Sequence, residues 1–580
     1  MTLTCLKTEL PAFENCYSPA WPNTLMNNTT RYRVRCYIPR SLLILFLLGF
    51  PQPCKLSAQE IPHLDRAAGS TQLIDGGKPF VILGGELGNS SAGTAAQADQ
   101  ILPRLARAHI NTVLMPVAWE QIEPVEGKFD FSILDHWIEQ ARTQHLHLVL
   151  LWFGSWKNAF SSYAPDWIKR DTKRFPRAIA PSGRPLEILS ALSKENVGAD
   201  SRAFRALMHH LKEFDAQPQI VLMVQVENEV GILDAARDHS AEADREFNGP
   251  VPAELLKYLR ANSDWLSPEV RHTWNPDGRT WRAVFADHAP EIFTAWNYAR
   301  YIGEVAAAGK SEYRLPMFVN AQLPAALERA GEYPSGGPHP KNLEIYRAAA
   351  PALDFYSPDI YWPDFEYWLQ RYSDHGNPIF VPEARLDAGP FNSFYAYGAA
   401  RAFGFSPFDV EKLPDVESEA DESKNPLAQT YSVLQQLTDI LPQAQREDRT
   451  RGLAAYANSP RAKQSVSLGG YLFTATLARS WPARTLLQDD GAMILLQTGP
   501  DEFLMGGTAL SIAVSVDPDT SDGIAGIASV EEGSRVNGEW ITARRLNGDQ
   551  SDQGRAISLP DHRVALLRVR LYKSPGTNLP

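Results

Sequence analysis

Short, continuous apolar runs alternate with amphipathic stretches along the chain from Phe80 to Arg446. Continuous runs are typical of strands whose two faces are both covered by other layers. We expect eight such strands, at Phe80–Gly84, Thr112–Pro116, Leu146–Trp152, Ile220–Val226, Met317–Asn320, Leu353–Tyr356, Ile379–Pro382 and near Ala396–Phe405. Helical periodicity predicts helices at Ala95–Ala108, Phe131–Gln144, Arg202–Phe214, Ile292–Ala308, Leu343–Ala349, Phe365–Tyr372 and Gln429–Arg446.

Eight strands, most of them followed by a helix, predict an α/β fold of the (β/α)8 TIM-barrel type with long loops. A doubly wound open sheet is the main alternative. Residues 232–290 contain Trp265, Trp274 and Trp281 among prolines, aspartates and arginines. We expect this segment to be an insertion at the C-terminal end of the fourth strand, the end of a barrel that carries its active site.

The pattern changes after about residue 450, where short strand-like runs are broken by Gly, Asp and Asn and helical periodicity disappears. This texture predicts a smaller all-β sandwich domain. A single core rarely grows beyond about 250–300 residues, so a chain of 580 residues is expected to hold more than one domain. We expect a catalytic barrel at 59–445 and a β-sandwich domain at 446–580, which either braces the barrel or binds sugar.

Residues 1–58 have the pattern of a signal peptide behind an unused upstream start. A basic segment, Arg31–Arg40, precedes the apolar run Ser41–Phe50, and small residues follow as far as Ala58. Met26 would open a normal signal peptide. The apolar run is about half of the ~20 residues that a membrane-spanning helix needs, so we expect no membrane span. The predicted location is the periplasm of a Gram-negative-type bacterium, its outer membrane or the medium.

The four cysteines all lie at or before Cys54, so a chain cleaved near Ala58 would contain none. Disulfides, thiol metal sites and a cysteine nucleophile are then excluded. The formal net charge of -12 comes without a basic stripe, which argues against a nucleic-acid partner. We expect neither a metal nor a cofactor. The oligomeric state stays open.

Two apolar strands end in acidic residues, and these ends carry the candidate chemistry. The heptapeptide Gln225–Gly231 includes Glu229, and Glu383 follows the strand that begins at Ile379. A buried carboxylate costs several kcal/mol unless it is paired, so acids at strand ends need a reason. A salt-bridged surface loop is the structural alternative. In a barrel, both acids would face one cup, and two facing carboxylates are what glycoside hydrolysis requires.

The heptapeptide resembles the Q-x-E-N-E-Y-G signature of glycoside hydrolase family 35, the β-galactosidases, which belong to a large clan of retaining (β/α)8 glycosidases. Other segments agree with this resemblance. Gly84-Gly85-Glu86 ends the first strand, Trp119–Phe131 is similar to the stretch after the second strand, and Ser357–Tyr361 lies where the clan keeps a tyrosine. The resemblance covers about residues 80–440.

The resemblance implies a role for several residues. Glu229 matches the acid/base, and Glu383 matches the nucleophile. Asn228 would bind the 2-hydroxyl of the sugar, and Tyr361 would orient the nucleophile. We also expect Arg385 to help to keep the nucleophile ionised, because an opposite charge nearby favours the charged form.

The chain departs from the family pattern at three places. Val230 stands where tyrosine is usual, and Gly85–Ser90 replaces the common G-E-x-H-Y. The third strand runs into Trp152–Asn158 instead of the usual Cys-Ala-Glu-Trp, and we expect Lys157 and Asn158 to substitute for the missing glutamate. These departures are typical of a divergent bacterial branch that includes enzymes removing galactose from xyloglucan side chains.

We further expect Glu86, Trp119 and Trp362 to contact substrate, with Trp362 as the best platform for a sugar ring. The sequence therefore predicts an exported retaining exo-β-galactosidase acting on plant oligo- or polysaccharides. Two alternatives remain open at this point. One is another exo-β-glycosidase of the clan, of the β-glucosidase or β-glucuronidase type, and the other is a barrel that binds carbohydrate without catalysis.

Overall fold

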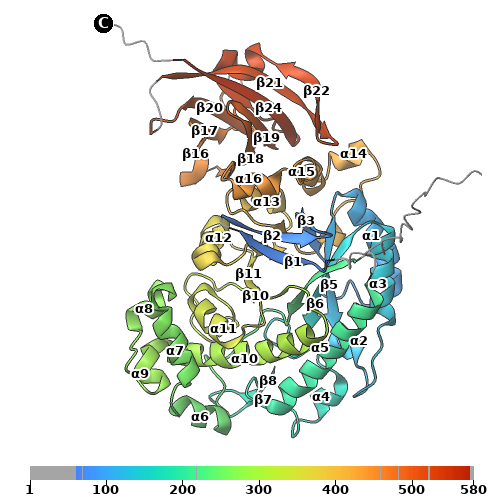
Figure 1. Cartoon of the computed structure of the whole chain (residues 1–580), viewed down its shortest axis with the longest axis vertical. Helices are drawn as coiled ribbons and strands as arrows, with labels where there is room; N and C mark the ends of the chain where they lie inside the picture. The colour runs from blue at the N-terminus through green and yellow to red at the C-terminus, as the bar shows by residue number, and fades with distance from the viewer. Residues whose placement is uncertain are drawn as a thin grey trace, which may run out of the picture. The chain divides into compact units, whose positions relative to one another are not determined.

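The computed structural model describes residues 60–67, 69–216, 219–457, 459–480, 483–519 and 523–574. The predicted signal peptide and upstream start lie outside the described residues. Figure 1 shows a helix-rich region, coloured from blue to yellow, followed by a strand-rich region in orange and red.

The first region is a closed barrel of parallel strands surrounded by helices, as predicted. Its strands are β4 (Ile82–Glu86), β5 (Thr112–Ala118), β6 (His147–Phe153), β9 (Val221–Val226), β10 (Met317–Gln322), β11 (Phe355–Ile360), β12 (Phe380–Val381), β13 (Glu383–Ala384) and β14 (Gly404–Phe405). Strands β12 and β13 are two halves of one barrel strand, interrupted at Pro382, which has no N–H to donate to a ladder. β13 pairs with β11, while β12 pairs with β14 and β14 with β4, so the ring closes with eight strand positions.

Two of the predicted strands differ from the observed ones. The segment near Ala396–Phe405 is largely occupied by the end of helix α13 (Gly389–Gly398), and only its last two residues form strand β14. Helix α13 is buried on most of its surface, so it lacks the polar face that would mark it as a helix. The sixth strand, predicted at Leu353–Tyr356, runs further as β11 and includes Asp359.

The helices cover the barrel in the predicted order. They are α1 (Ala95–Arg107), α2 (Trp119–Ile122), α3 (Ser132–Thr143), α4 (Asp166–Arg170), α5 (Lys194–Phe214), α10 (Ala289–Glu312), α11 (Leu343–Ala349), α12 (Phe365–Ser373), α14 (Glu419–Glu422), α15 (Pro426–Gln435) and α16 (Leu441–Arg446). The single helix predicted at Gln429–Arg446 is two helices, α15 and α16. Pro442 lies in the first turn of α16, a position that suits a helix start and breaks a longer helix.

The N-terminal half of the barrel is a packed apolar core. Strands β1 (His63–Ala67), β2 (Ser70–Asp75) and β3 (Lys78–Phe80) form a small antiparallel sheet next to it. Leu73 of β2 joins a buried cluster inside the barrel with Phe318, Phe355 and Phe380. The rings of Phe318 and Phe355 stack with their centres 5.0 Å apart. This end of the barrel is therefore filled rather than open.

The predicted insertion follows β9 and contains α6 (Ala241–Asn248), α7 (Ala253–Ala261), α8 (Pro268–Thr273) and α9 (Trp281–Phe285). A short hairpin, β7 (Arg177–Ile179) and β8 (Pro185–Leu189), lies in the preceding loop. Trp281 is buried, whereas Trp265 lines a cavity together with Leu353 and Asp354, which precede β11. Part of the insertion therefore lies at the N-terminal end of the barrel, away from the end where it begins.

The second region consists of antiparallel sheets, as predicted. Its strands are β15 (Thr450–Tyr456), β16 (Lys463–Leu468), β17 (Tyr471–Leu477), β18 (Asp490–Gly499), β19 (Glu502–Thr508), β20 (Leu510–Val516), β21 (Ile524–Val536), β22 (Glu539–Leu546), β23 (Ala556–Ser558) and β24 (Ala565–Ser574). They form a six-stranded sheet in the order β15-β18-β19-β24-β21-β22 and a four-stranded sheet in the order β16-β17-β20-β23. Tyr471, Phe473 and Phe503 belong to the apolar cluster between them.

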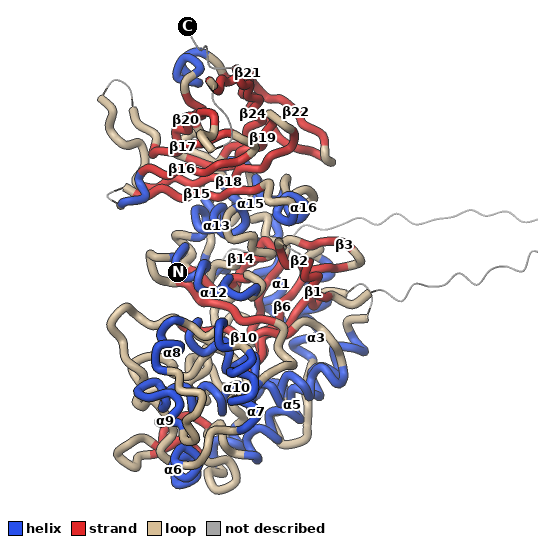
Figure 2. Tube along the Cα trace, turned by 60° about the vertical axis from the view of Figure 1, so that its left-hand side comes forward, coloured by secondary structure: helices blue, strands red, loops and turns tan. Residues whose placement is uncertain are grey.

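Helices α13, α15 and α16 lie between the barrel strands and the C-terminal sheets, as Figure 2 shows. Arg535 of β21 donates to the Gln436 carbonyl oxygen at 3.0 Å and forms an ion pair with Asp439 after α15. The C-terminal sheets are thus joined to the barrel by both apolar and polar contacts, which suits the bracing role. Their predicted boundary at residue 446 stays a prediction.

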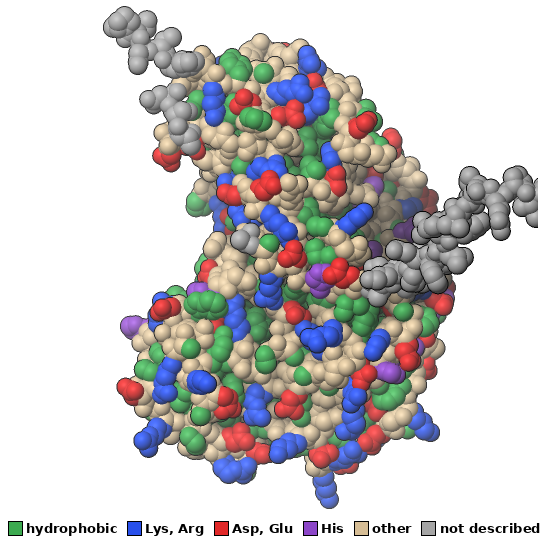
Figure 3. All heavy atoms as spheres, in the orientation of Figure 1, with side chains coloured by type: hydrophobic (Ala, Val, Ile, Leu, Met, Phe, Trp, Pro, Cys, Tyr) green, Lys and Arg blue, Asp and Glu red, His purple; other side chains and the backbone are tan. Residues whose placement is uncertain are grey.

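In the part of the chain that the structure describes, no helix is both long enough and apolar enough to span a bilayer. On the face drawn in Figure 3, Lys and Arg side chains are interspersed with Asp and Glu side chains. The absence of a nucleic-acid partner stays a prediction.

Candidate active site

Four carboxyl groups gather at the C-terminal end of the barrel. Glu86 ends β4, Glu229 follows β9, Asp359 lies near the end of β11, and Glu383 begins β13. Asp359 and Glu383 are direct register partners in the sheet. One carboxylate oxygen from each of Glu229, Asp359 and Glu383 lies within 4.8 Å of the others. The two acids predicted from the sequence are therefore brought together, with two further acids beside them.

Glu229 is held by amide groups from two neighbouring strands. Its backbone N–H donates to Asn320 Oδ1 at 2.9 Å, and Asn158 Nδ2 donates to its carboxylate oxygen Oε2. Burial, and then the charge of Glu383, raise the pKa of Glu229 to about 7, although Lys157 opposes this shift. A carboxyl group with a pKa near 7 can both give and take a proton at neutral pH, as an acid/base catalyst must.

Glu383 accepts a hydrogen bond from the phenol of Tyr361, whose hydroxyl oxygen lies 2.5 Å from its Oε1. Burial, and then the charge of Glu383, raise the pKa of Tyr361 well above its usual value, so this phenol stays a donor. The predicted orienting role of Tyr361 thus has its contact in the structure. The second oxygen of Glu383, Oε2, has no hydrogen-bond partner among the described residues.

Lys157 supplies positive charge to this acidic cluster. Burial by itself would lower the pKa of Lys157, but the charges of Glu383 and then Glu229 outweigh it and raise that pKa. The ammonium also lies 5.2 Å from the ring centre of Phe153. The spacing of the three nearest carboxylates would suit metal ligands, but the buried ammonium beside them already supplies counter-charge. The cluster therefore fits acid/base chemistry better than a cation site.

Glu86 and Asp359 are both almost fully buried. Burial, and then the charge of Glu383, raise the pKa of each carboxyl group well above its usual value. Asp359 also accepts a hydrogen bond from Asn320 Nδ2 at 2.6 Å. Burial and Glu383 thus disfavour the charged form of both groups, which limits the negative charge around the two central acids.

Asn228 is fully buried, yet neither side-chain atom of its amide has a hydrogen-bond partner among the described residues. Buried polar groups are usually paired, so an unpaired amide next to two catalytic-type carboxyls indicates a ligand-binding group. This agrees with the implied contact of Asn228 with a sugar hydroxyl.

Trp119 and Arg385, two of the predicted site residues, do not make the contacts predicted for them. Trp119 is completely buried, and its indole N–H donates to Glu123 Oε2 at 2.8 Å, so it is a core residue that fixes the turn after β5. Arg385 pairs with Asp387, two residues further along, through a contact of 2.5 Å, rather than with Glu383. The roles predicted for these two residues were wrong, because a closer partner in each case takes the donor.

Trp362 is partly exposed, as a side chain that stacks on a sugar ring must be. Its side chain is 41% exposed, and its indole N–H donates to the Leu323 carbonyl oxygen at 3.1 Å. The ring is thus fixed in place beside Tyr361 while part of its surface remains accessible. Its role as a sugar platform stays a prediction.

Sequence reasoning missed three residues that shape the site. Asp359 belongs to the segment Ser357–Tyr361, where only Tyr361 has a predicted role. Asn320 links Glu229 to Asp359, and Asp200 lies on α5 behind the third strand. The sequence signal for Asp359 is weak, because Ser357 and Pro358 separate it from the predicted strand Leu353–Tyr356. No local pattern marks Asp200, which lies in an ordinary helical segment.

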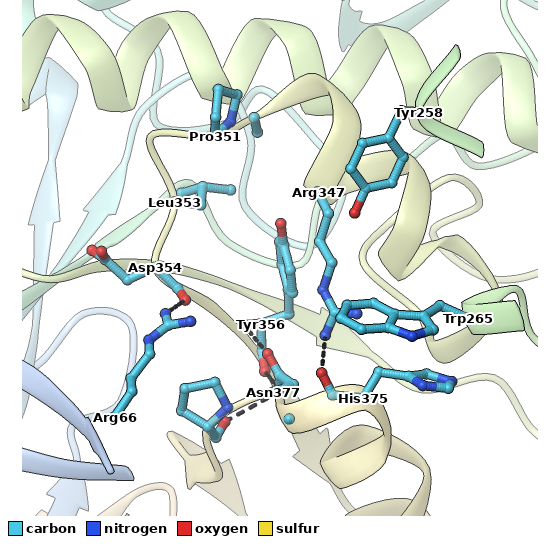
Figure 4. A pocket seen from close by; sticks show the side chains of 13 residues that line it. Arg66, Tyr258, Trp265, Arg347, Pro351, Leu353, Asp354, Tyr356, His375 and Asn377 are labelled. Carbon is cyan, nitrogen blue, oxygen red and sulfur yellow. Dashed lines mark hydrogen bonds between the residues drawn. The ribbon is translucent and has the colours of Figure 1, made fainter. Parts of the chain in front are cut away.

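A second cavity, of about 330 Å³, lies at the N-terminal end of the barrel (Figure 4). Trp265 stacks on His375 with ring centres 5.4 Å apart, and the Arg347 guanidinium lies 5.5 Å from the indole centre. Its one lining carboxylate, Asp354, lies 2.6 Å from Lys310 Nζ. This cavity therefore lacks the paired acids of the other end.

Two family models match parts of the chain. One, described as Beta-galactosidase (Glyco_hydro_42), matches residues 90–292, which include Glu229 but not Glu383. The other, described as a domain of unknown function (DUF5597), matches residues 427–558. The first match supports a glycosidase of the β-galactosidase type, although membership of family 35 is not confirmed. No curated protein matches the sequence.

Several solved structures are similar to part of this chain. The β-galactosidase from Bacillus circulans sp. alkalophilus aligns at 15% identity and a TM-score of 0.42, over 63% of this chain and 57% of that one. The β-galactosidase from the psychrophilic Marinomonas ef1 aligns at 13% identity and a TM-score of 0.40, over 61% of this chain and 59% of that one. The catalytic domain of a β-amylase from Paenibacillus polymyxa aligns at 11% identity and a TM-score of 0.40, over 60% of this chain and 98% of that one. This chain thus spans less than two thirds of the first two chains.

Proposed function

We propose that this chain is a retaining exo-β-galactosidase that releases terminal β-linked galactose from plant oligo- or polysaccharide side chains, xyloglucan among them. The observation that carries the proposal is the meeting of Glu229 and Glu383, whose nearest oxygens lie within 4.8 Å at the end of the barrel. Retaining glycosidases hold their two carboxyl groups about 5–5.5 Å apart, whereas inverting ones need about 6.5–9.5 Å to admit a water.

In the first half of the reaction, a Glu383 carboxylate oxygen attacks the anomeric carbon. Glu229, protonated because its pKa is near 7, gives its proton to the glycosidic oxygen, and the bond to the aglycone breaks. In the second half, Glu229 takes a proton from water and the resulting hydroxyl displaces Glu383. The product is β-galactose, and both acids return to their starting states.

The surrounding groups suit these roles. The Tyr361 hydroxyl fixes one oxygen of Glu383 and leaves the other unpaired and available for attack. The Lys157 ammonium supplies positive charge beside Glu383, the contact first expected of Arg385. Asn158 fixes the acid/base, and the unpaired Asn228 amide can bind the 2-hydroxyl, a contact that strengthens in the transition state.

The site argues against a β-glucuronidase. A glucuronide would add a carboxylate to a cluster that already holds four carboxyl groups around Lys157. Like charges in a buried site are mutually unfavourable, so a neutral sugar fits better. A binding barrel without catalysis would not need an acid whose pKa is near 7 opposite a second carboxylate.

A panel of nitrophenyl β-glycosides tests the proposed function. We expect the highest kcat/KM on the β-galactoside, and galactose as the product from a xyloglucan oligosaccharide with terminal galactose. A higher rate on the β-glucoside, or inversion of the product anomer observed by NMR, would contradict the proposal. Export is also proposed, and recovery of a mature chain that starts near residue 59 from a periplasmic extract would support it.

A further inference from the structure

Behind the active site lie two more buried carboxyl groups, those of Glu227 and Asp200, which have no part in the proposed reaction. Glu227 lies two residues before the acid/base, and Asp200 lies on α5; both side chains are fully buried. Asp200 accepts from Trp152 Nε1 at 2.9 Å, from Ser155 Oγ at 2.6 Å and from Ser155 N at 3.2 Å. These donors are all neutral.

Glu227 completes the arrangement from the other side. Its Oε2 accepts from the backbone N–H of Trp156 at 2.7 Å, while Oε1 has no N–H or O–H donor among the described residues. Burial, and then the charge of Asp200, raise the pKa of the Glu227 carboxyl group well above its usual value. An oxygen without a donor can carry a proton, whereas both oxygens of Asp200 already accept hydrogen bonds, so the proton belongs on Glu227.

Glu227 and Asp200 accept hydrogen bonds from the turn that carries Lys157 and Asn158 and so hold it in place. Just before these two site residues, the Trp156 N–H donates to Glu227 and the Ser155 N–H donates to Asp200. Glycine is needed at position 154, because an added Cβ would lie 2.3 Å from Trp152 Nε1 and 2.6 Å from Glu227 Oε1. The turn is therefore pressed directly against the carboxyl pair.

Backbone hydrogen bonds join the same turn to the residues that follow β9. The Ala159 N–H donates to the Glu229 carbonyl oxygen at 3.1 Å, and the Asn228 N–H donates to the Trp156 carbonyl oxygen at 3.3 Å. Asn158, Ala159, Glu227 and Glu229 all have positive φ, between 45° and 67°. Such backbone persists only where the surrounding contacts over-determine it.

We propose that Glu227 carries a proton and that Glu227 and Asp200 act as positioning residues, holding the turn at 154–159 so that Lys157 and Asn158 reach the two central acids. This inference rests on the proposed function for its consequence in catalysis, but not for the protonation of Glu227. Neither residue touches substrate.

The test compares the same substitution at two neighbouring positions. In Glu227→Gln, the amide oxygen can accept from Trp156 N–H and the amide N–H can donate to Asp200, so kcat should stay within about 3-fold of the wild type. Glu227→Leu keeps similar volume but removes both bonds, and we expect kcat to fall at least about 10-fold while KM changes less. Glu229→Gln is the contrast, because there the amide cannot supply the proton.

Infrared spectroscopy checks the proton itself, without reference to activity. Well above pH 7, where Glu229 is ionised, wild-type protein should show a buried carboxylic-acid C=O band that is absent from Glu227→Gln and unchanged in Glu229→Gln. Loss of kcat in Glu227→Gln as large as in Glu227→Leu, or no difference in the C=O band, would overturn the inference. If the wild type hydrolyses no galactoside while the C=O band is lost from Glu227→Gln as expected, the proposed function fails and the protonation of Glu227 stands.

Discussion

Polar groups lie at both ends of the barrel, but the two ends differ in whether these groups have hydrogen-bond or ion-pair partners. At the N-terminal end, Asp354 pairs with Lys310, and Asn377 bonds the backbone of Tyr356 in both directions, at 3.1 and 2.8 Å (Figure 4). At the C-terminal end, atoms of Glu86, Asn228, Asp359 and Glu383 have no partner among the described residues.

The contrast teaches where stability and activity are located. A buried polar group that is fully paired can hold elements together at little net cost, whereas an unpaired one costs about 1–3 kcal/mol. A fold tolerates several such costs in one place when a ligand later supplies the partners. The paired groups at the N-terminal end therefore stabilise the barrel, and the C-terminal end is arranged for chemistry.

The largest effect is expected from Glu383→Gln. The substituted amide keeps the shape of the side chain and the acceptor for Tyr361, but it cannot attack the anomeric carbon, so kcat should fall by at least about 10⁴-fold. Steady-state hydrolysis of nitrophenyl β-galactoside measures this, with unchanged thermal unfolding as the control for folding. A residual rate near that of the wild type would remove Glu383 from the mechanism.

Glu229→Gln should reduce kcat by about 10²–10⁴-fold, the range that general acid–base catalysis supplies. The loss should be smaller for an aryl galactoside with a good leaving group, because such a group needs little protonation to depart. Measurement of kcat on a dinitrophenyl and on a methyl galactoside separates the two cases. Equal losses on both substrates would contradict the acid role of Glu229.

The pH dependence of kcat/KM should report the ionisation of Glu229. The pKa of Glu229 is raised to about 7, first by burial and then by Glu383, so its acid form predominates below that pH and is lost above it. The value of kcat/KM should therefore fall by about tenfold per pH unit above pH 7. An alkaline limb that stays in place in Glu229→Gln would assign it to another group.

At the opposite end, Trp265→Ala should affect stability rather than activity. The substitution removes the stacking on His375 and the cation–π contact with Arg347, so we expect a loss of about 1–2 kcal/mol in the free energy of unfolding. The value of kcat should stay within about twofold of the wild type. Denaturant unfolding and a galactoside assay on the same preparation give both quantities, and a larger change in kcat than in stability would break the contrast between the two ends.

The sequence predicted the barrel well, because continuous apolar runs are hard to explain except as strands covered on both faces. It predicted Glu229 and Glu383 for the same reason, since each acid interrupts such a run at its end. The prediction failed for helix α13, Gly389–Gly398, whose aromatic and small residues are buried on most sides and lack helical periodicity.

Contacts between distant segments account for the remaining errors. Nothing local shows that Arg385 bonds to Asp387 rather than to the acid two residues before it. The helix that carries Asp200 has the same pattern whether that acid faces solvent or the back of the site. The raised pKa of Glu86 depends on burial and on Glu383, which is brought near only by closure of the barrel.

The most direct test of the two-acid site is to trap the intermediate. A 2-deoxy-2-fluoro-β-galactoside with a good leaving group should inactivate the enzyme slowly, and mass spectrometry of the digested protein should place one fluorogalactosyl group on Glu383. A label on Glu86, Glu229 or Asp359 would contradict the account, as would turnover of galactosides without any covalent label on the chain.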